Sequence, residues 1–153
     1  MTEDMAKEYC QTNLDTVTRQ FIDGDLSRID NALAIPSKVR TMGTALRVER
    51  LEALEVMLEE QRSTPLDLGT TEYRRICIDA KFINPVGTQI SGRHKTRVMR
   101  GGTYLVDPYF CEHALVKEGP HWRASHIRCG MKARESTTIA PRAFEHLLER
   151  QAT

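Results

Sequence analysis

Apolar side chains recur at helical spacing near the start of the chain. Between residues 3 and 22, one stripe carries Met5, Tyr9, Asn13, Val17 and Phe21, with Cys10 and Leu14 beside it. This stripe predicts an amphipathic helix that packs against a large apolar surface. Asn13 is the polar member of the buried face and is therefore a candidate for function.

Two further helices are expected in the first half of the chain. Asp23-Gly24-Asp25 ends the first helix, and a short second helix, capped by Asp25 or Ser27, is predicted to run to Ala34 before Pro36 stops it. Residues 38–43 are compatible with a short strand. From Leu46 to Arg62 the pattern predicts a third helix, with one face made of Val48, Leu51, Leu54 and Leu58.

The second half of the chain is typical of antiparallel strands. Alternating, β-branched and aromatic segments predict strands over residues 75–86, 90–99, 103–106, 109–117 and 122–131, with a hairpin turn at 118–121. A short closing helix is expected over residues 141–151. Helices followed by antiparallel strands indicate an α+β fold, and 153 residues suit a single domain spanning 1–153.

Charge and hydropathy narrow the classes of partner. The 22 basic and 21 acidic residues give a net charge of +1, which argues against a duplex-binding protein. The basic segment 93–100 lacks interleaved aromatic residues and is interpreted as a solvated strand, so no nucleic-acid partner is expected. No apolar run is long enough for a membrane span, and the acidic first residues do not resemble a secretory signal, so we expect a cytoplasmic protein.

The cysteines and histidines do not have the spacing of a metal site. Cys10, Cys77, Cys111 and Cys129 are widely separated and are expected to be reduced and mostly buried. Neither His94 with His113 nor Cys111 with His113 has diagnostic spacing. We therefore predict no metal and no nucleotide cofactor.

Three local motifs, in order along residues 5–132, resemble the nuclear transport factor 2 and SnoaL-like superfamily. They are the segment 21–29, with its aromatic residue and Gly-Asp-Leu corner; the Asn-Pro strand 82–86 with the turn at 89–92; and the Gly-to-Trp-Arg hairpin 118–124. The resemblance implies a cone, in which three N-terminal helices cover a curved antiparallel sheet. It also implies an interior suited to an apolar small molecule and, commonly, a homodimer.

The catalytic dyad of the family's dehydratase-like branch is absent. That branch carries an Asp at the helical corner and a His four residues before the Asn of the Asn-Pro strand. The corresponding positions here are Ile22 and Ala80. A shift of one residue brings in Asp23, but Ala80 still offers no base, and Asp79 and Lys81 alternate onto the opposite face. This departure argues against ordinary His/Asp dehydration.

Four other residues are candidates for proton chemistry: His126, His113, Tyr104 and Asn13. Strict alternation places Trp122, Ala124 and His126 on one face, which favours an inward-facing His126. The same alternation puts Arg128 on the face of His126. There Arg128 would either reach the cavity and stabilise an oxyanion or lie at the solvent rim of the cone. The alternatives are a solvated cross-strand pair for His113 and a half-buried, satisfied His126. A single bulge after Gly92 would exchange the inward-facing and outward-facing residues of the last three strands.

Two function classes follow from the resemblance. The first is a cofactor-independent enzyme that cyclises, isomerises, dehydrates or opens an epoxide on a hydrophobic polyketide, terpenoid or aromatic substrate. In it Tyr104 and Asn13 would orient a substrate oxygen, and the predicted substrate-binding residues are Phe21, Phe82, Asn84, Phe110, Trp122 and Arg128. The second is a non-catalytic protein of the same fold that binds a ligand or serves as an oligomeric subunit, which the missing dyad favours.

Overall fold

A computed structural model describes residues 1–41, 44–56, 58–59, 69–105 and 107–129. Its first helix, α1 (Glu3–Asp23), confirms the predicted amphipathic helix. The Thr2 hydroxyl accepts a hydrogen bond from the Met5 N–H at the beginning of the helix, and Gly24 ends it in the left-handed conformation with φ 73°. The buried stripe is Ala6, Cys10, Asn13, Leu14, Val17 and Phe21.

The predicted second helix is wrong. Only a 3₁₀ turn, η1 (Ile29–Asn31), precedes strand β1 (Leu33–Thr41), so Ala34 and Pro36 lie in a strand. A short apolar run such as Leu33-Ala34-Ile35 fits a buried strand as well as a helix. Pairing of β1 with a distant strand, β7 (His121–Cys129), decides the outcome.

The predicted third helix is too long at its beginning. Residues 44–48 form strand β2 (Thr44–Val48), which pairs with β1 in antiparallel register. Helical structure begins at residue 51 and includes residues 51–56 and 58–59. Val48 is buried as a strand residue, whereas Leu54 and Leu58 are buried on the helix as expected. The end of the predicted helix at Arg62 lies outside the described residues.

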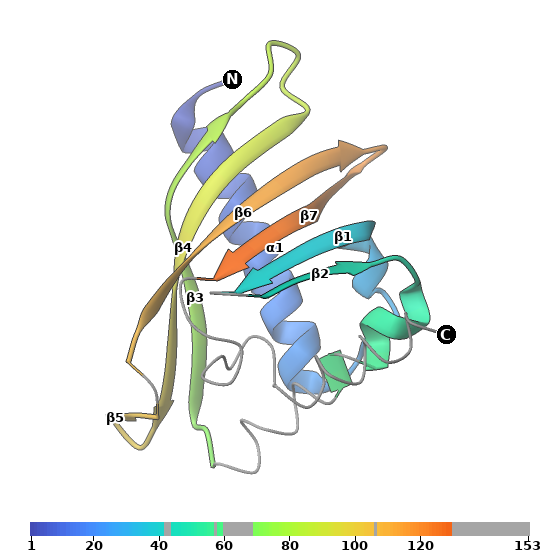
Figure 1. The fold of residues 1–153 in the computed structure, drawn as a ribbon. Coiled ribbons are helices and arrows are strands. Elements are labelled where there is room, and N and C mark those ends of the chain that lie inside the picture. Colours follow the sequence, from blue (N-terminus) through green and yellow to red (C-terminus); the bar gives the residue numbers. More distant parts are fainter. Residues whose placement is uncertain (42–43, 57, 60–68, 106, 130–153) are drawn as a thin grey trace.

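Strands from both halves of the chain form one curved sheet. Its order is β2-β1-β7-β6-β4-β3, with β5 (Thr103–Tyr104) paired to the end of β4. The predicted strands of the second half correspond to β3 (Glu72–Phe82), β4 (Gln89–Arg100), β6 (Tyr109–Glu118) and β7. Figure 1 shows α1 lying along one face of this sheet, called here the inner face. The main cluster of buried apolar residues lies between α1 and the inner face.

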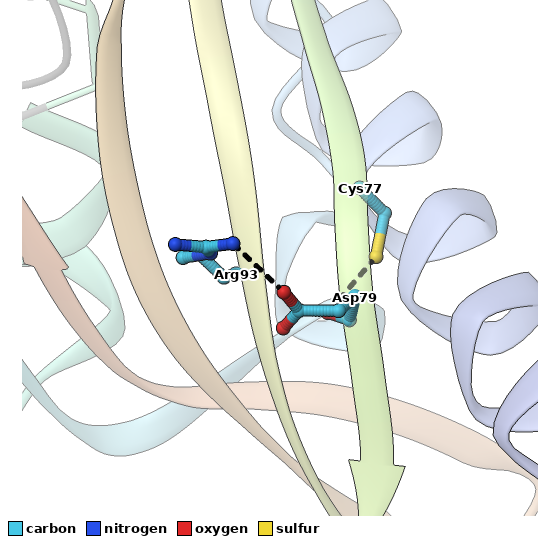
Figure 2. A network of polar contacts seen from close by, with 3 residues as sticks. All are labelled: Cys77, Asp79 and Arg93. Atoms are coloured by element: carbon cyan, nitrogen blue, oxygen red, sulfur yellow. Dashed lines mark hydrogen bonds and ion pairs between the residues drawn. The ribbon is translucent and has the colours of Figure 1, made fainter.

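Two bulges determine which side chains reach the inner face. In β3 the register with β4 shifts between Cys77 and Asp79, after which Ala80 faces inward. Figure 2 shows the result: Cys77 lies on the helix side of β3, while Asp79 points to the other side and contacts Arg93 at 3.0 Å. The alternation predicted for Asp79 and Ala80 is therefore confirmed. In β7 the corresponding shift occurs at Ser125.

The expected closing helix over residues 141–151 and the end of the strand predicted to Met131 lie outside the described residues. Across the part of the chain that the structure describes, none of the helices has the length and apolar character needed to cross a membrane.

Candidate functional site

A cavity lies between α1, the helical residues 51–56 and 58–59, and the inner face of the sheet. The volume of this cavity that the centre of a water molecule can occupy is ≈ 60 Å³. Most of its described wall is apolar, and the polar or charged members are Thr18, Ser37, Lys38, Arg75 and His126. The apolar members are Val17, Phe21, Leu33, Val39, Leu54, Leu58, Tyr73, Ala124 and Ile127.

Arg75 is the buried cation in this wall. It lies on β3 with 6% of its surface exposed, and α1 holds its guanidinium in place. The Nε–H donates to Thr18 Oγ1 at 3.0 Å, and Nη2 donates to the Leu14 carbonyl at 3.1 Å. Both acceptors are neutral, so among the described residues this guanidinium makes no ion pair.

Two buried histidines lie in the neighbouring rows of the inner face. The Nδ1 atoms of His94 on β4 and His113 on β6 are 2.8 Å apart, and the two residues are 1% and 4% exposed. No described group forms a hydrogen bond with either Nε2 atom. Burial lowers the pKa of His94 to about 2 and that of His113 to about 4, and the nearby Arg75 cation acts in the same direction. Both imidazoles are therefore neutral near pH 7.

Gly92 makes the space that His113 occupies. A Cβ atom at this position would lie 2.7 Å from His113 Nε2 and 3.2 Å from the Asp79 carbonyl oxygen. The backbone of β4 therefore forms one wall of the histidine pair. The sequence predicted His113 as a candidate for proton chemistry or as a solvated cross-strand residue, and it considered His94 with His113 only as metal ligands. The solvated position is wrong, because His113 is buried, and the pairing of the two rings was not predicted.

The prediction that His126 shares a face with Ala124 is wrong. Ala124 pairs with Leu115 and His126 pairs with Ala114, so Ser125 is the extra residue of a bulge. The bulge turns Ile127 inward and leaves His126 half-buried on the other face, where it also borders a surface hollow beside Lys38 and Arg40. Burial lowers the pKa of His126, and the cations of Arg40 and Lys38 lower it further.

The same bulge accounts for the position of the Arg128 side chain. Its side chain is exposed and lies 3.8 Å from the Glu112 carboxylate, on the face opposite the cavity. Of the two alternatives for Arg128, the solvent position is the one observed.

Asn13 and Tyr104 have surroundings that differ from those expected of groups orienting a substrate. The Asn13 side-chain amide donates to the carbonyl oxygens of Ala32 at 2.9 Å and Trp122 at 3.0 Å, so it joins α1 to η1 and β7. Tyr104 lies on the two-residue strand β5 and is 46% exposed. Neither residue is part of the described cavity wall.

The predicted substrate-binding residues other than Arg128 lie in four different places. Phe21 lines the cavity, and Phe82 and Trp122 pack with Tyr9 in a separate aromatic cluster. Phe110 is 49% exposed on the outer face, with the Arg93 guanidinium 5.5 Å from its ring centre, so it does not form cavity wall. Asn84 organises the β3–β4 turn through Thr88, whose N–H it accepts at 3.0 Å.

Arg75 is the residue of this site that sequence reasoning missed. Alternation in β3 places it on the same face as the buried Cys77, two positions later. A basic residue two positions from a buried apolar one was a signal that could have marked it.

Among the described residues no group of three or more His, Cys, Asp or Glu side chains is arranged to hold a metal ion.

Comparisons with known proteins give structural matches alone. No family model matches this sequence, and no curated protein matches it. Among solved structures it resembles a designed protein, a variant of Rd1NTF2_05, with TM-score 0.61, 10% identity, and coverage of 79% of this chain and 96% of that one. It also resembles a domain of unknown function with a cystatin-like fold from Nostoc punctiforme, with TM-score 0.59, 11% identity, and coverage of 99% and 97%. An NTF2-like protein from Novosphingobium aromaticivorans gives TM-score 0.58 and 11% identity, with coverage of 83% and 82%.

Proposed function

Since this chain has the nuclear transport factor 2-like fold, we propose that it binds a small, largely apolar molecule in its inner cavity without transforming it. The observation that carries this proposal is the cavity itself, whose described wall, from α1, the sheet and the helical residues, is mostly apolar. Concave apolar sites with a few placed polar groups are the usual form of small-molecule sites.

The arrangement of the candidate catalytic groups supports binding over catalysis. Asn13 is engaged with two backbone carbonyls, and Tyr104 lies on β5 away from the described cavity wall. His113 is paired with His94, and neither imidazole belongs to that wall. General acid–base catalysis requires a titratable group within hydrogen-bond reach of the reacting atom.

The cavity's size limits the ligand. One water needs roughly 10–15 Å³ of such space, so ≈ 60 Å³ corresponds to about four to six water-sized groups, which is the size of a single ring or a short chain. A larger ligand would require α1 or the helical residues 51–56 and 58–59 to move outward. We therefore expect short-chain or single-ring compounds to bind first.

Methyl NMR on the wild-type protein tests the proposal. A library of small aliphatic and single-ring compounds is titrated against Ile, Leu and Val methyl-labelled protein. Binding predicts shifts of the Val17, Val39 and Leu54 methyl signals, which line the cavity from three elements. The absence of saturable shifts at these methyls throughout the library would refute the proposal.

Two variants in which leucine replaces an alanine locate the site. Ala124→Leu fills the cavity from β7 and is expected to abolish the shifts, because Ala124 lines the wall. Ala114→Leu adds the same atoms to β6 at a residue outside that wall and is the matched control. Equal binding by both variants would place the ligand elsewhere.

A second candidate function is proton-transfer catalysis on a hydrophobic polyketide, terpenoid or aromatic substrate. It is favoured by one observation: Arg75, which could stabilise an oxyanion, lines the cavity, and His126 also borders this cavity from β7, although its position in the register is on the outer face. Any turnover found with a bound compound is to be measured in a His113→Gln/His126→Gln double variant. Unchanged turnover would remove these histidines from the chemistry.

A further inference from the structure

We propose that the ligand is a small apolar carboxylic acid, bound as its anion with the carboxylate on the Arg75 guanidinium. The inference rests on the function proposed above and adds the chemical class of the ligand. It also makes Arg75 the residue that determines specificity.

A guanidinium remains protonated in proteins, so Arg75 carries a positive charge into the interior. Burial of a charge is costly unless an opposite charge or a full set of hydrogen bonds compensates it. The described acceptors of Arg75 are one hydroxyl and one carbonyl, both neutral.

Among the described residues, no acidic side chain pairs with Arg75. Asp79 and Glu112 face the other side of the sheet, where they contact Arg93 and Arg128 respectively. The titratable groups whose pKa values respond to Arg75 include His94 and His113, which are neutral near pH 7 and supply no negative charge. Within the described part of the chain the positive charge is therefore uncompensated.

Residues of α1 hold the Arg75 guanidinium from one side. Thr18 and Leu14 accept from Nε and Nη2 on the α1 side of the guanidinium, and Arg75 also lines the cavity. The other N–H groups of the guanidinium form no hydrogen bond with a described residue. A guanidinium fixed in this way presents a planar fork that matches the two oxygens of a carboxylate.

A carboxylate fits this wall better than a doubly charged anion does. Arg75 is the buried cation of the described wall, and Lys38, the other cation there, is solvent-exposed. A phosphate dianion would bring a second charge into the same apolar surroundings without a partner. The remaining wall, with Val17, Phe21 and Val39, suits the hydrocarbon part of the ligand.

Paired ligands test this inference on the unmodified protein. Affinities are measured by calorimetry at pH 7 for benzoate against benzamide and for hexanoate against hexanamide, which differ in charge but little in shape. Charge-assisted hydrogen bonds predict tighter binding of each acid by about 10-fold to 100-fold. Equal affinity within a pair would overturn the carboxylate assignment.

Variants of two adjacent arginines give a second readout. Arg75→Met removes the guanidinium and is expected to eliminate the preference for acid over amide, whereas Arg75→Lys keeps a charge and part of the preference. Arg74→Met, at the exposed neighbouring position on β3, is the matched control and is expected to keep the full preference. In wild-type protein, the Arg75 Nε–Hε signal should shift with benzoate and remain in place with benzamide.

The outcomes separate this inference from the proposal on which it rests. If both acids and amides bind with cavity methyl shifts and equal affinity, the ligand-binding function stands and the role of Arg75 is refuted. If neither acids nor amides nor any other library compound perturbs the cavity methyls, the binding function itself fails. If Arg75→Met does not fold, the wild-type ligand pairs and the Arg75 signal still decide the question.

Discussion

The Nδ1 atoms of His94 and His113 lie 2.8 Å apart in the buried inner layer of the sheet, so these atoms share one proton. One imidazole donates from Nδ1, and the other accepts there and therefore carries its own proton on Nε2. The pair thus contains two different tautomers. A second proton would place a charge in a buried site beside the Arg75 cation.

This relationship predicts that stability decreases as the pH falls. The folded pKa values, about 2 for His94 and about 4 for His113, are below the ordinary value of 6.5. Below pH 6.5 the unfolded chain therefore binds protons that the folded chain does not, and unfolding becomes easier. Each histidine contributes a slope approaching about 1.4 kcal/mol per pH unit. Urea titrations at pH 7.5, 6.5, 5.5 and 5.0 measure the free energy of unfolding.

A double variant isolates the contribution of the pair. His94→Asn/His113→Asn keeps polar groups near the Nδ1 positions but cannot titrate, and its free energy of unfolding should change much less between pH 6.5 and 5.0. His121→Asn, on the β6–β7 hairpin, is the matched control and should keep the wild-type slope. A wild-type slope in the double variant would show that other groups cause the pH dependence.

Gly92→Ala is expected to destabilise the protein because the new methyl would lie 2.7 Å from His113 Nε2. Overpacking of this kind typically costs about 1–3 kcal/mol. Chemical denaturation measures the loss in the wild-type background and again in His113→Ala, which removes the ring. If the ring causes the cost, the substitution at Gly92 costs less in the second background. Equal costs in both would instead identify the Asp79 carbonyl as the obstacle.

Local periodicity predicted most of the elements in this fold. The stripe ending at Val17 and Phe21 predicted α1, and alternation predicted β3, β4, β6 and β7 to within a few residues. The second helix was wrong because the preference of residues 33–35 is weak, and β1 forms through pairing with β7, far away in the sequence. Such pairing leaves no periodic signal in the segment itself.

The candidate site was predicted less well than the elements. It depends on which face of the sheet each side chain points to and on contacts between elements. The extra residue at Ser125 reversed the orientation of His126 and Arg128, and a bulge of this kind has no clear sequence signal here. Arg75 becomes distinctive only when Thr18 and Leu14 of α1 lie beside it. Phe110 looked like cavity wall from its residue type, but alternation from the buried Cys111 puts it outside.

Asn13→Leu is expected to reduce stability by about 1–3 kcal/mol, since it removes the donor to the Trp122 carbonyl. The Ala32 carbonyl also loses this donor but still accepts the Ala124 N–H at 2.8 Å. Thermal and urea denaturation measure the change, and Thr12→Ala on the exposed side of α1 is the control. A fully stable Asn13→Leu protein would show that the contacts of this side chain are not structural.

Phe21 and Phe110 are expected to differ in their effect on ligand affinity. Phe21→Leu removes part of the cavity wall and should weaken binding of an apolar ligand by about fivefold, for a loss of about 1 kcal/mol of apolar contact. Phe110→Leu, the same replacement on the outer face, should leave affinity unchanged. Calorimetric titration with benzoate compares the two, and a larger effect at Phe110 would contradict the cavity assignment.

The four cysteines are expected to be unreactive in the folded protein. Cys10, Cys77, Cys111 and Cys129 are all reduced and buried, as the sequence predicted. The Cys111 thiol donates to Cys129 Sγ at 3.0 Å, and this hydrogen bond together with burial raises the pKa of Cys111. A hydrogen bond from Cys10 lowers the pKa of Cys77, so that thiol is protected by its burial, with 2% of its surface exposed. Because reaction needs both access and the thiolate, Ellman's reagent should react slowly with the native protein and completely after unfolding in urea.

A cysteine introduced at an exposed position makes this expectation quantitative. Thr103→Cys on β5 provides a thiol in contact with solvent, which should react within minutes while the four native thiols do not. The rate for the native thiols should then follow the rate of unfolding rather than the concentration of the reagent, because exposure requires the core to open. Rapid reaction of a native cysteine without loss of tertiary structure would mean that the layer between α1 and the sheet opens locally. A ligand could enter the cavity by the same opening, so repeating the assay with saturating benzoate would test whether occupancy slows it.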